Sequence, residues 1–113
     1  MTARIASVQI GQIAPLGPER VASAFIKSAV SGPTKAGVLG LDGDHQADLS
    51  VHGGPEKAVY AYASARYPDW AAAFPDLAAR FVAGAMGENL TVDGMIEDDL
   101  CIGDVHAIGG ALL

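Results

Sequence analysis

The chain has 113 residues, of which 50% are hydrophobic and 18% charged, and its formal net charge is −6. This length and composition predict one globular domain and exclude a disordered chain. The seven Lys and Arg residues form no basic cluster, so we expect no binding to a nucleic-acid polymer. We also expect a cytoplasmic protein without membrane contact. The apolar runs are too short for a span, no signal pattern follows Met1, and a single cysteine allows no intrachain disulfide.

The first part of the chain is predicted to be rich in strands. Apolar residues in Ile5–Ile10 favour a strand, and Thr34–Leu41 is interpreted as a second one. Between them, Arg20–Ile26 fits either a short helical turn or an extended segment, and Ser31–Pro33 is typical of a turn.

The middle of the chain predicts one strand followed by a helix. Ala58–Tyr62 reads as a strand, and Ser64–Phe74 is the strongest helical pattern, with Ser64 as its N-cap. Pro68 predicts a kink or two short pieces, and Asp76–Phe81 predicts a further turn. The residues at helical spacing on one face are assigned to the core: Tyr67, Trp70, Ala71 and Phe74.

The last part predicts two more strand regions. In Met86–Val92 a glycine precedes a strand, and Cys101–Ile108 predicts a hairpin that turns at Gly103 and Asp104. Cys101 is interpreted as a buried structural cysteine, and His106 as an outward-facing residue of an alternating strand. The apolar residues 111–113 resemble a strand cut in mid-course.

The stretch 39–62 concentrates the polar chemistry of the chain. Consecutive glycines after His52 allow positive φ angles and can turn several N–H groups toward one anion, and Lys57 adds a positive charge. The alternative is a turn with a surface lysine. Similarly, the Gly87-Glu88-Asn89 segment either lines a pocket or caps a turn.

Metal and nucleophile patterns are weaker. Asp42–Asp48 lacks the glycine and glutamate of an EF-hand loop, and its first residue fits an Asx turn. His45, His52, His106 and Cys101 match no zinc spacing, so no metal ligand is assigned. Ser50, Ser64 and Cys101 lack a partner pattern, and the catalytic residues stay unassigned.

In combination, four segments resemble the MOSC domain, the module named for the C-terminal part of molybdenum cofactor sulfurase, and its YiiM-like branch in particular. The segments occur in the family's order and extend over essentially the whole chain: Gly40–Tyr62, Tyr67–Trp70, Met86–Val92 and Cys101–Asp104.

The resemblance implies a mainly β fold, a partly closed β-barrel with one or two short helices, over a single, C-terminally incomplete domain of residues 1–113. It implies a molybdenum cofactor of the molybdopterin type, and either reduction of N-hydroxylated compounds such as hydroxylaminopurine or sulfur transfer. A small-molecule substrate, an electron-donor protein and a family-level association with pyridoxal phosphate follow from it too. It assigns cofactor binding to Asp44, Asp48, His52, Gly53, Gly54, Lys57, Gly87, Glu88 and Asn89.

One departure affects the expected activity. The family's functional cysteine lies beyond a segment like 111–113, and Cys101 does not occupy that position. We therefore expect impaired catalysis, and whether the chain is an enzyme stays open. The alternative is a non-catalytic binding or structural β-barrel module. Missing terminal strands would expose a sheet edge, which a homodimer can cover.

Overall fold

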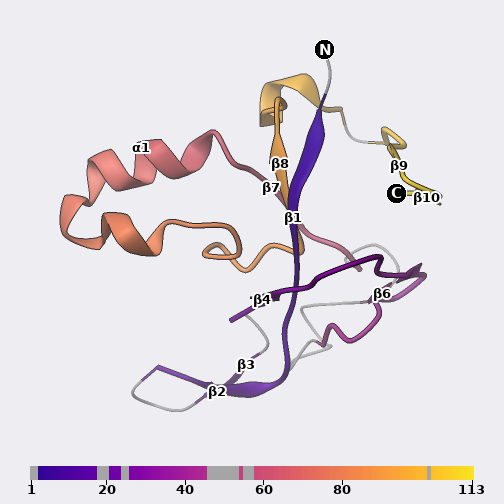
Figure 1. The fold of residues 1–113 in the computed structure, drawn as a ribbon, viewed down its shortest axis with the longest axis horizontal. Coiled ribbons are helices and arrows are strands. Elements are labelled where there is room, and N and C mark those ends of the chain that lie inside the picture. The colour runs from indigo at the N-terminus through magenta and orange to yellow at the C-terminus, as the bar shows by residue number, and fades with distance from the viewer. Residues whose placement is uncertain (1–2, 18–20, 24–25, 46–53, 55–57, 102) are drawn as a thin grey trace.

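A computed structural model gives the fold of residues 3–17, 21–23, 26–45, 54, 58–101 and 103–113 (Figure 1). These residues form short strands with one α-helix and two 3₁₀ helices, which confirms the mainly β prediction. The elements are β1 (Arg4–Ile10), β2 (Ala14–Leu16), β3 (Val21–Ser23), β4 (Ser28–Ala29), β5 (Ala36–Gly37), β6 (Gly40–Leu41), β7 (Ala61–Ala63), α1 (Arg66–Ala73), η1 (Pro75–Arg80), β8 (Leu90–Asp93), η2 (Glu97–Asp99), β9 (Ala107–Ile108) and β10 (Ala111–Leu112).

A four-stranded sheet in the order β4-β1-β8-β7 forms the centre of the molecule. Strand β1 runs antiparallel to β8, with Val8 opposite Leu90, and the register shifts between Ile5 and Ser7. Strand β7 runs parallel to β8, with Tyr62 opposite Thr91. The remaining strands form separate two-stranded sheets, so the sheets of the described residues do not close into a barrel.

The parallel pairing of β7 and β8 requires a crossover, and α1 with η1 supplies it. This helical excursion projects to one side of the central sheet, and the β9–β10 hairpin lies on the opposite side (Figure 1). None of the helices in the described ranges is long and apolar enough to cross a membrane.

Helix α1 forms where the sequence predicts it, but its start differs from the prediction. Ala65 is the N-cap residue, whereas the Ser64 hydroxyl donates to an Asp93 carboxylate oxygen on β8. Pro68 causes no break, because it lies in the first turn, where the backbone N–H has no partner within a helix.

The predicted core face of α1 is only partly buried. Tyr67 is buried, whereas Trp70 and Phe74 are 38% and 49% exposed. Trp70 stacks with Phe74 and Phe81 instead, and its indole N–H donates to the Tyr62 hydroxyl over 2.7 Å. Much of the aromatic packing of this helical segment is therefore internal to it. The prediction that the whole face belongs to the core was wrong.

Two strand predictions in the first half are refined. Residues 34–41 do not form one strand but a tight hairpin of β5 and β6, in which Gly37 lies opposite Gly40. Gly40 has a φ of 135°, which breaks the extended run. The ambiguous segment 20–26 contains the strand β3, and the predicted strand 58–62 begins at Ala61.

The C-terminal hairpin turns later than predicted. The pairs are Ala111 with Ile108 and Leu112 with Ala107, so the turn lies at Gly109 and Gly110. Cys101 precedes the hairpin and is exposed, contrary to its predicted burial. The Asp104 carboxylate accepts the Cys101 N–H over 2.9 Å, and the Asp104 N–H donates to the Cys101 carbonyl over 3.1 Å, so Cys101 pairs with Asp104 and not with a strand.

Candidate functional site

A buried polar network lies where β1, β8 and α1 meet, and Glu88 is its centre. The Glu88 side chain has no exposed surface. Its Oε2 accepts hydrogen bonds from the Tyr67 hydroxyl and, over 2.9 Å, from Thr91 Oγ1, while its Oε1 accepts the Met86 N–H over 3.1 Å. Three donors, from α1, β8 and the turn before β8, thus satisfy a carboxylate that would otherwise be costly to bury.

Gln9 extends this network into β1. Its Nε2 donates to the Glu88 carbonyl over 3.0 Å and to Thr91 Oγ1 over 3.1 Å. Its Oε1 is buried without a hydrogen-bond partner in the part of the chain that the structure describes. Gly84, with a φ of 91°, covers Gln9, since a Cβ there would lie 3.3 Å from Gln9 Cγ. The network is therefore closed on that side.

The Tyr67 hydroxyl is harder to deprotonate than an exposed phenol. Burial is the largest cause that raises the pKa of Tyr67, and the hydrogen bond to Glu88 raises it further, while the Met86 N–H opposes the shift. The phenol therefore stays a neutral donor to Glu88 throughout the physiological pH range.

A second cluster surrounds Asp44, whose side chain is only 1% exposed. Asp44 Oδ1 accepts the Gly11 N–H over 2.8 Å and lies 2.9 Å from Nζ of Lys27, which is also buried. Asp44 Oδ2 accepts from Asn89 Nδ2 over 2.9 Å. The donors come from the end of β1, the start of β4 and the start of β8, so one carboxylate ties together three segments.

Asn89 joins the two clusters through both polar atoms of its side chain. Its Nδ2 donates to Asp44 and, over 3.1 Å, to the Gln9 carbonyl, and its Oδ1 accepts the Tyr60 N–H over 3.0 Å. Its backbone N–H donates to the Tyr60 carbonyl over 2.7 Å. Asn89 therefore holds both ends of the stretch between Asp44 and Tyr60.

The predicted cofactor residues divide into two groups. Asp44, Glu88 and Asn89 are brought together by the network, and Gly87 with a φ of 77° forms the buried turn that leads into it. Gly54 has a φ of 81°, and a Cβ there would meet none of the described residues within 4 Å. Asp48, His52, Gly53 and Lys57 lie outside the described residues, so their assignment stays a prediction.

Four members of these clusters were not predicted as site residues from the sequence: Gln9, Lys27, Tyr67 and Thr91. Gln9 and Thr91 carry a weak signal, because each is a polar residue between apolar neighbours in a central strand, where a buried polar group needs a partner. Lys27 carries none, since its pairing with Asp44 depends on how the chain folds.

The described ranges contain no group of three or more His, Cys, Asp or Glu side chains that could hold a metal ion. Each side-chain oxygen and nitrogen of Glu88 and Asn89 already has a protein partner. The assignment of these two residues to cofactor binding stays a prediction.

Comparison with known proteins agrees with the sequence motifs. The sequence model of the MOSC domain matches residues 48–113. The protein YiiM of Escherichia coli K12 is 45% identical over 96 residues, which cover 85% of this chain and 43% of YiiM. A protein of Gibberella moniliformis described as a reductase is 40% identical over 98 residues, which cover 87% of this chain and 17% of the relative.

A solved structure of a relative has the same fold as this chain. The crystal structure of YiiM from Escherichia coli superposes with a TM-score of 0.71 and 32% identity, and the superposition covers 99% of this chain and 44% of YiiM. The chain thus spans less than half the length of these relatives. The matched motifs and the shared fold show that the chain belongs to the MOSC domain family.

Proposed function

We propose that the chain provides the cofactor-facing wall of a molybdenum-cofactor reductase that acts on small N-hydroxylated compounds. The MOSC family is associated with the molybdenum cofactor, and a relative described as a reductase favours reduction over sulfur transfer. The cofactor would supply the redox chemistry, and the residues of this chain would bind and position it.

The observation that carries this proposal is the position of Asn89. Its side-chain amide binds Asp44 at one end and Tyr60 at the other end of the polar stretch in which the sequence predicts the anion-binding glycines and Lys57. A segment that binds a phosphate through backbone N–H groups needs fixed ends, because each freely rotating residue raises the entropic cost of binding. The buried Asn89 amide holds both ends of this segment in place.

The alternative is a structural module in which the same hydrogen bonds only hold the fold together. To distinguish the two, the chain would be produced in a host that makes molybdopterin and purified without chelators. We expect bound molybdenum by elemental analysis and a pterin by fluorescence after oxidative release. A folded sample that carries neither would support the structural module.

A matched pair of lysine variants would test the predicted anion contact. Lys57→Ala should reduce pterin retention at least tenfold without changing the urea midpoint, whereas Lys35→Ala, at an exposed position, should leave both unchanged. Equal retention in the two variants would remove Lys57 from the site while leaving family membership intact.

A further inference from the structure

The tryptophan and the tyrosines of the chain lie in one continuous group. The sequence contains one Trp and three Tyr residues, and all four lie between positions 60 and 70. The ring centroids of Tyr60 and Tyr62 are 6.4 Å apart and those of Tyr62 and Tyr67 are 5.4 Å apart, and both pairs meet edge to face. Trp70 joins the group through its indole N–H, which donates to the Tyr62 hydroxyl over 2.7 Å. Tyr62 therefore lies between the other three.

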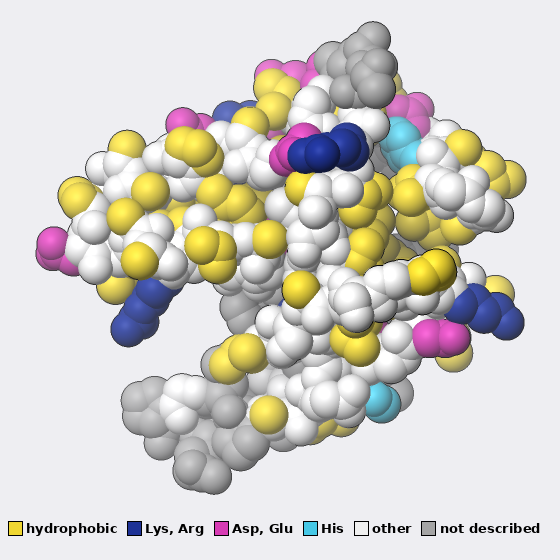
Figure 2. All heavy atoms as spheres, viewed as in Figure 1, with side chains coloured by type: hydrophobic (Ala, Val, Ile, Leu, Met, Phe, Trp, Pro, Cys, Tyr) yellow, Lys and Arg dark blue, Asp and Glu magenta, His cyan; other side chains and the backbone are white. Residues whose placement is uncertain are grey.

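The two ends of this group have different surroundings. Trp70 is exposed, and its hydrogen bond to Tyr62 also lies at the surface. Figure 2 shows hydrophobic side chains at the surface of the helical excursion of α1 and η1, to which Trp70 belongs. Tyr67, in contrast, is buried. An oxidant in solution can thus reach Trp70 but not Tyr67.

The buried end has a proton acceptor within hydrogen-bonding distance. The Tyr67 hydroxyl donates to Glu88 Oε2, and the Glu88 side chain has no exposed surface. A phenol that loses an electron becomes a strong acid, so its oxidation is favourable where a base can take the proton at once. Because a buried negative charge is costly, transfer of this proton to Glu88 also removes a charge from the interior. These contacts therefore favour a tyrosyl radical at Tyr67 over one at Tyr62.

We infer that the group is a one-electron relay, which carries an oxidising equivalent from Trp70 through Tyr62 to the buried pair of Tyr67 and Glu88. The inference rests on the side-chain contacts and not on the proposed cofactor. In the first step, a one-electron oxidant at the surface takes an electron from the Trp70 indole, whose N–H proton passes to water. Tyr62 then gives the hydrogen atom of its hydroxyl, proton and electron together, to the indole nitrogen 2.7 Å away.

The second step returns Tyr62 to its starting state. An electron passes from the Tyr67 ring to the neighbouring Tyr62 radical. The Tyr67 proton moves to Glu88 Oε2, and the Tyr62 phenolate takes a proton from water. The products are a tyrosyl radical at Tyr67, a neutral Glu88 and unchanged Trp70 and Tyr62. The oxidising equivalent thereby moves from the surface into the interior.

Pulse radiolysis with azide radicals would test the relay, because this one-electron oxidant attacks tryptophan faster than tyrosine at neutral pH. The protein would be the 113-residue chain with Cys101→Ser, which removes a competing exposed thiol. We expect the absorption of the tryptophyl radical to decay while that of a tyrosyl radical rises, at a rate independent of protein concentration. Decay without a tyrosyl signal, or at a rate proportional to protein concentration, would overturn the inference.

Two tyrosine variants on the same background provide a matched control. Tyr62→Phe keeps the ring but removes the hydroxyl that bonds to Trp70, so the transfer should slow at least tenfold. Tyr60→Phe changes a ring that lies beside Tyr62 but outside the path, and it should leave the rate unchanged. Circular dichroism would check that both variants are folded. Equal rates in the two variants would show that Tyr62 is not the intermediate and would overturn the relay.

The buried end point needs its own measurement. A radical at Tyr67 should survive ascorbate in solution at least tenfold longer than the radical formed in Tyr67→Phe, where oxidation stops at Tyr62. Glu88→Gln keeps the shape of the side chain without its charge, and its radical should be as short-lived as that of Tyr67→Phe. If Glu88→Gln does not fold, Tyr67→Phe alone decides the outcome. Equal lifetimes in the chain with and without the Tyr67 hydroxyl would overturn the assignment of the end point.

Discussion

The two sides of the central sheet differ in how completely they are built. Around Glu88 and Asn89, the buried side-chain polar atoms other than Gln9 Oε1 meet partners at hydrogen-bonding distance, and even the glycine at position 84 packs closely. Around the β9–β10 hairpin, large apolar side chains such as Val105 and Leu112 stay exposed at 70% and 74%. Polar contacts therefore fix the geometry of one side, whereas on the other side large apolar side chains face solvent.

Removing the carboxylate of Glu88 should have the largest effect. Glu88→Ala leaves the Tyr67 and Thr91 hydroxyls without their acceptor, and leaves the Met86 N–H only the Tyr67 hydroxyl oxygen at 3.3 Å. Because each unsatisfied buried donor costs about 1–3 kcal/mol, we expect a loss of about 3–5 kcal/mol in the free energy of unfolding. Urea denaturation followed by circular dichroism would measure it. If this variant does not fold, Glu88→Gln should still fold with a loss of about 1–3 kcal/mol.

The exposed Glu97 provides the control for that loss, because its ion pair with Arg66 lies at the surface. Glu97→Ala should change the unfolding curve little. Equal losses at positions 88 and 97 would contradict the central place given to the buried network.

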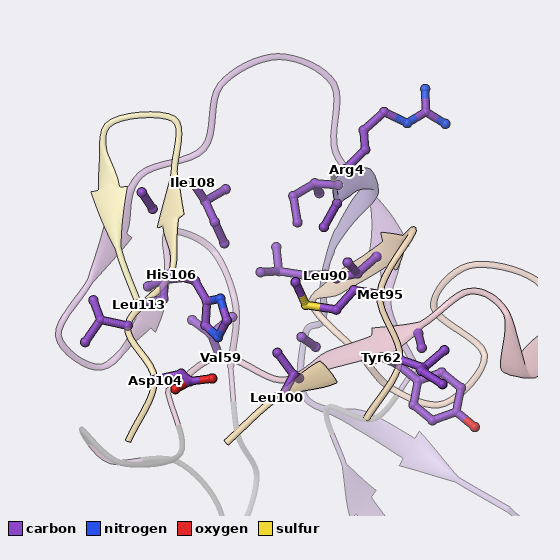
Figure 3. A pocket seen from close by; sticks show the side chains of 18 of the residues that line it. Arg4, Val59, Tyr62, Leu90, Met95, Leu100, Asp104, His106, Ile108 and Leu113 are labelled. Atoms are coloured by element: carbon purple, nitrogen blue, oxygen red, sulfur yellow. The ribbon is translucent and has the colours of Figure 1, made fainter. Parts of the chain in front are cut away.

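Two leucines test the apolar side. Leu90 is 6% exposed and Leu100 is 43% exposed, although both line a cavity between the central sheet and the β9–β10 hairpin (Figure 3). Leu90→Ala should cost about 2–5 kcal/mol and Leu100→Ala less than about 1 kcal/mol in the free energy of unfolding, measured by urea denaturation. Equal losses for the two leucines would contradict the difference in burial between them.

The dependence of the free energy of unfolding on pH should report the ionisation of the Tyr67 hydroxyl. Its pKa is raised in the folded chain above the ordinary value of 10.0, chiefly by burial. The unfolded chain therefore loses this proton first, and the associated stability is complete below about pH 10 and declines as the pH rises further. Tyr67→Phe should lower stability at neutral pH by about 1–3 kcal/mol and make the decline above pH 10 less steep. Parallel curves for the two proteins would show that another group causes the decline.

The smallest change in stability is expected for a substitution of Cys101, because this residue is exposed. Cys101→Ser should change the free energy of unfolding by less than about 0.5 kcal/mol. The native thiol should react with a maleimide about as fast as the thiol of the urea-unfolded chain. A much slower reaction of the native thiol than of the unfolded one would instead support the burial of Cys101 that the sequence predicted.

The sequence predicted the elements that depend on local patterns. Strand β1, the helix near Trp70 and the strand after Gly87 all appear close to their predicted places, because apolar periodicity and glycine act over a few residues. The C-terminal hairpin was misplaced since Gly103 and Gly109 both adopt positive φ, and only pairing with a later strand decides which of them turns the hairpin.

The site was predictable only in part, for a similar reason. Glu88 and Asn89 stand out beside a glycine, and Asp44 lies in a conspicuous polar stretch. Their partners do not, because Lys27 reaches Asp44 across 17 residues and Gln9 reaches Thr91 across 82. Such contacts depend on the topology of the sheet, which no local pattern encodes.

The antiparallel pairing of β1 with β8 also determines when this domain can fold. Val8 lies opposite Leu90, so the first strand has to wait until most of the chain has left the ribosome before it finds its neighbour. Closing so long a loop is entropically costly and slows folding. During synthesis, the apolar residues of β1 are therefore exposed to other chains, and this interval is one in which the protein can aggregate.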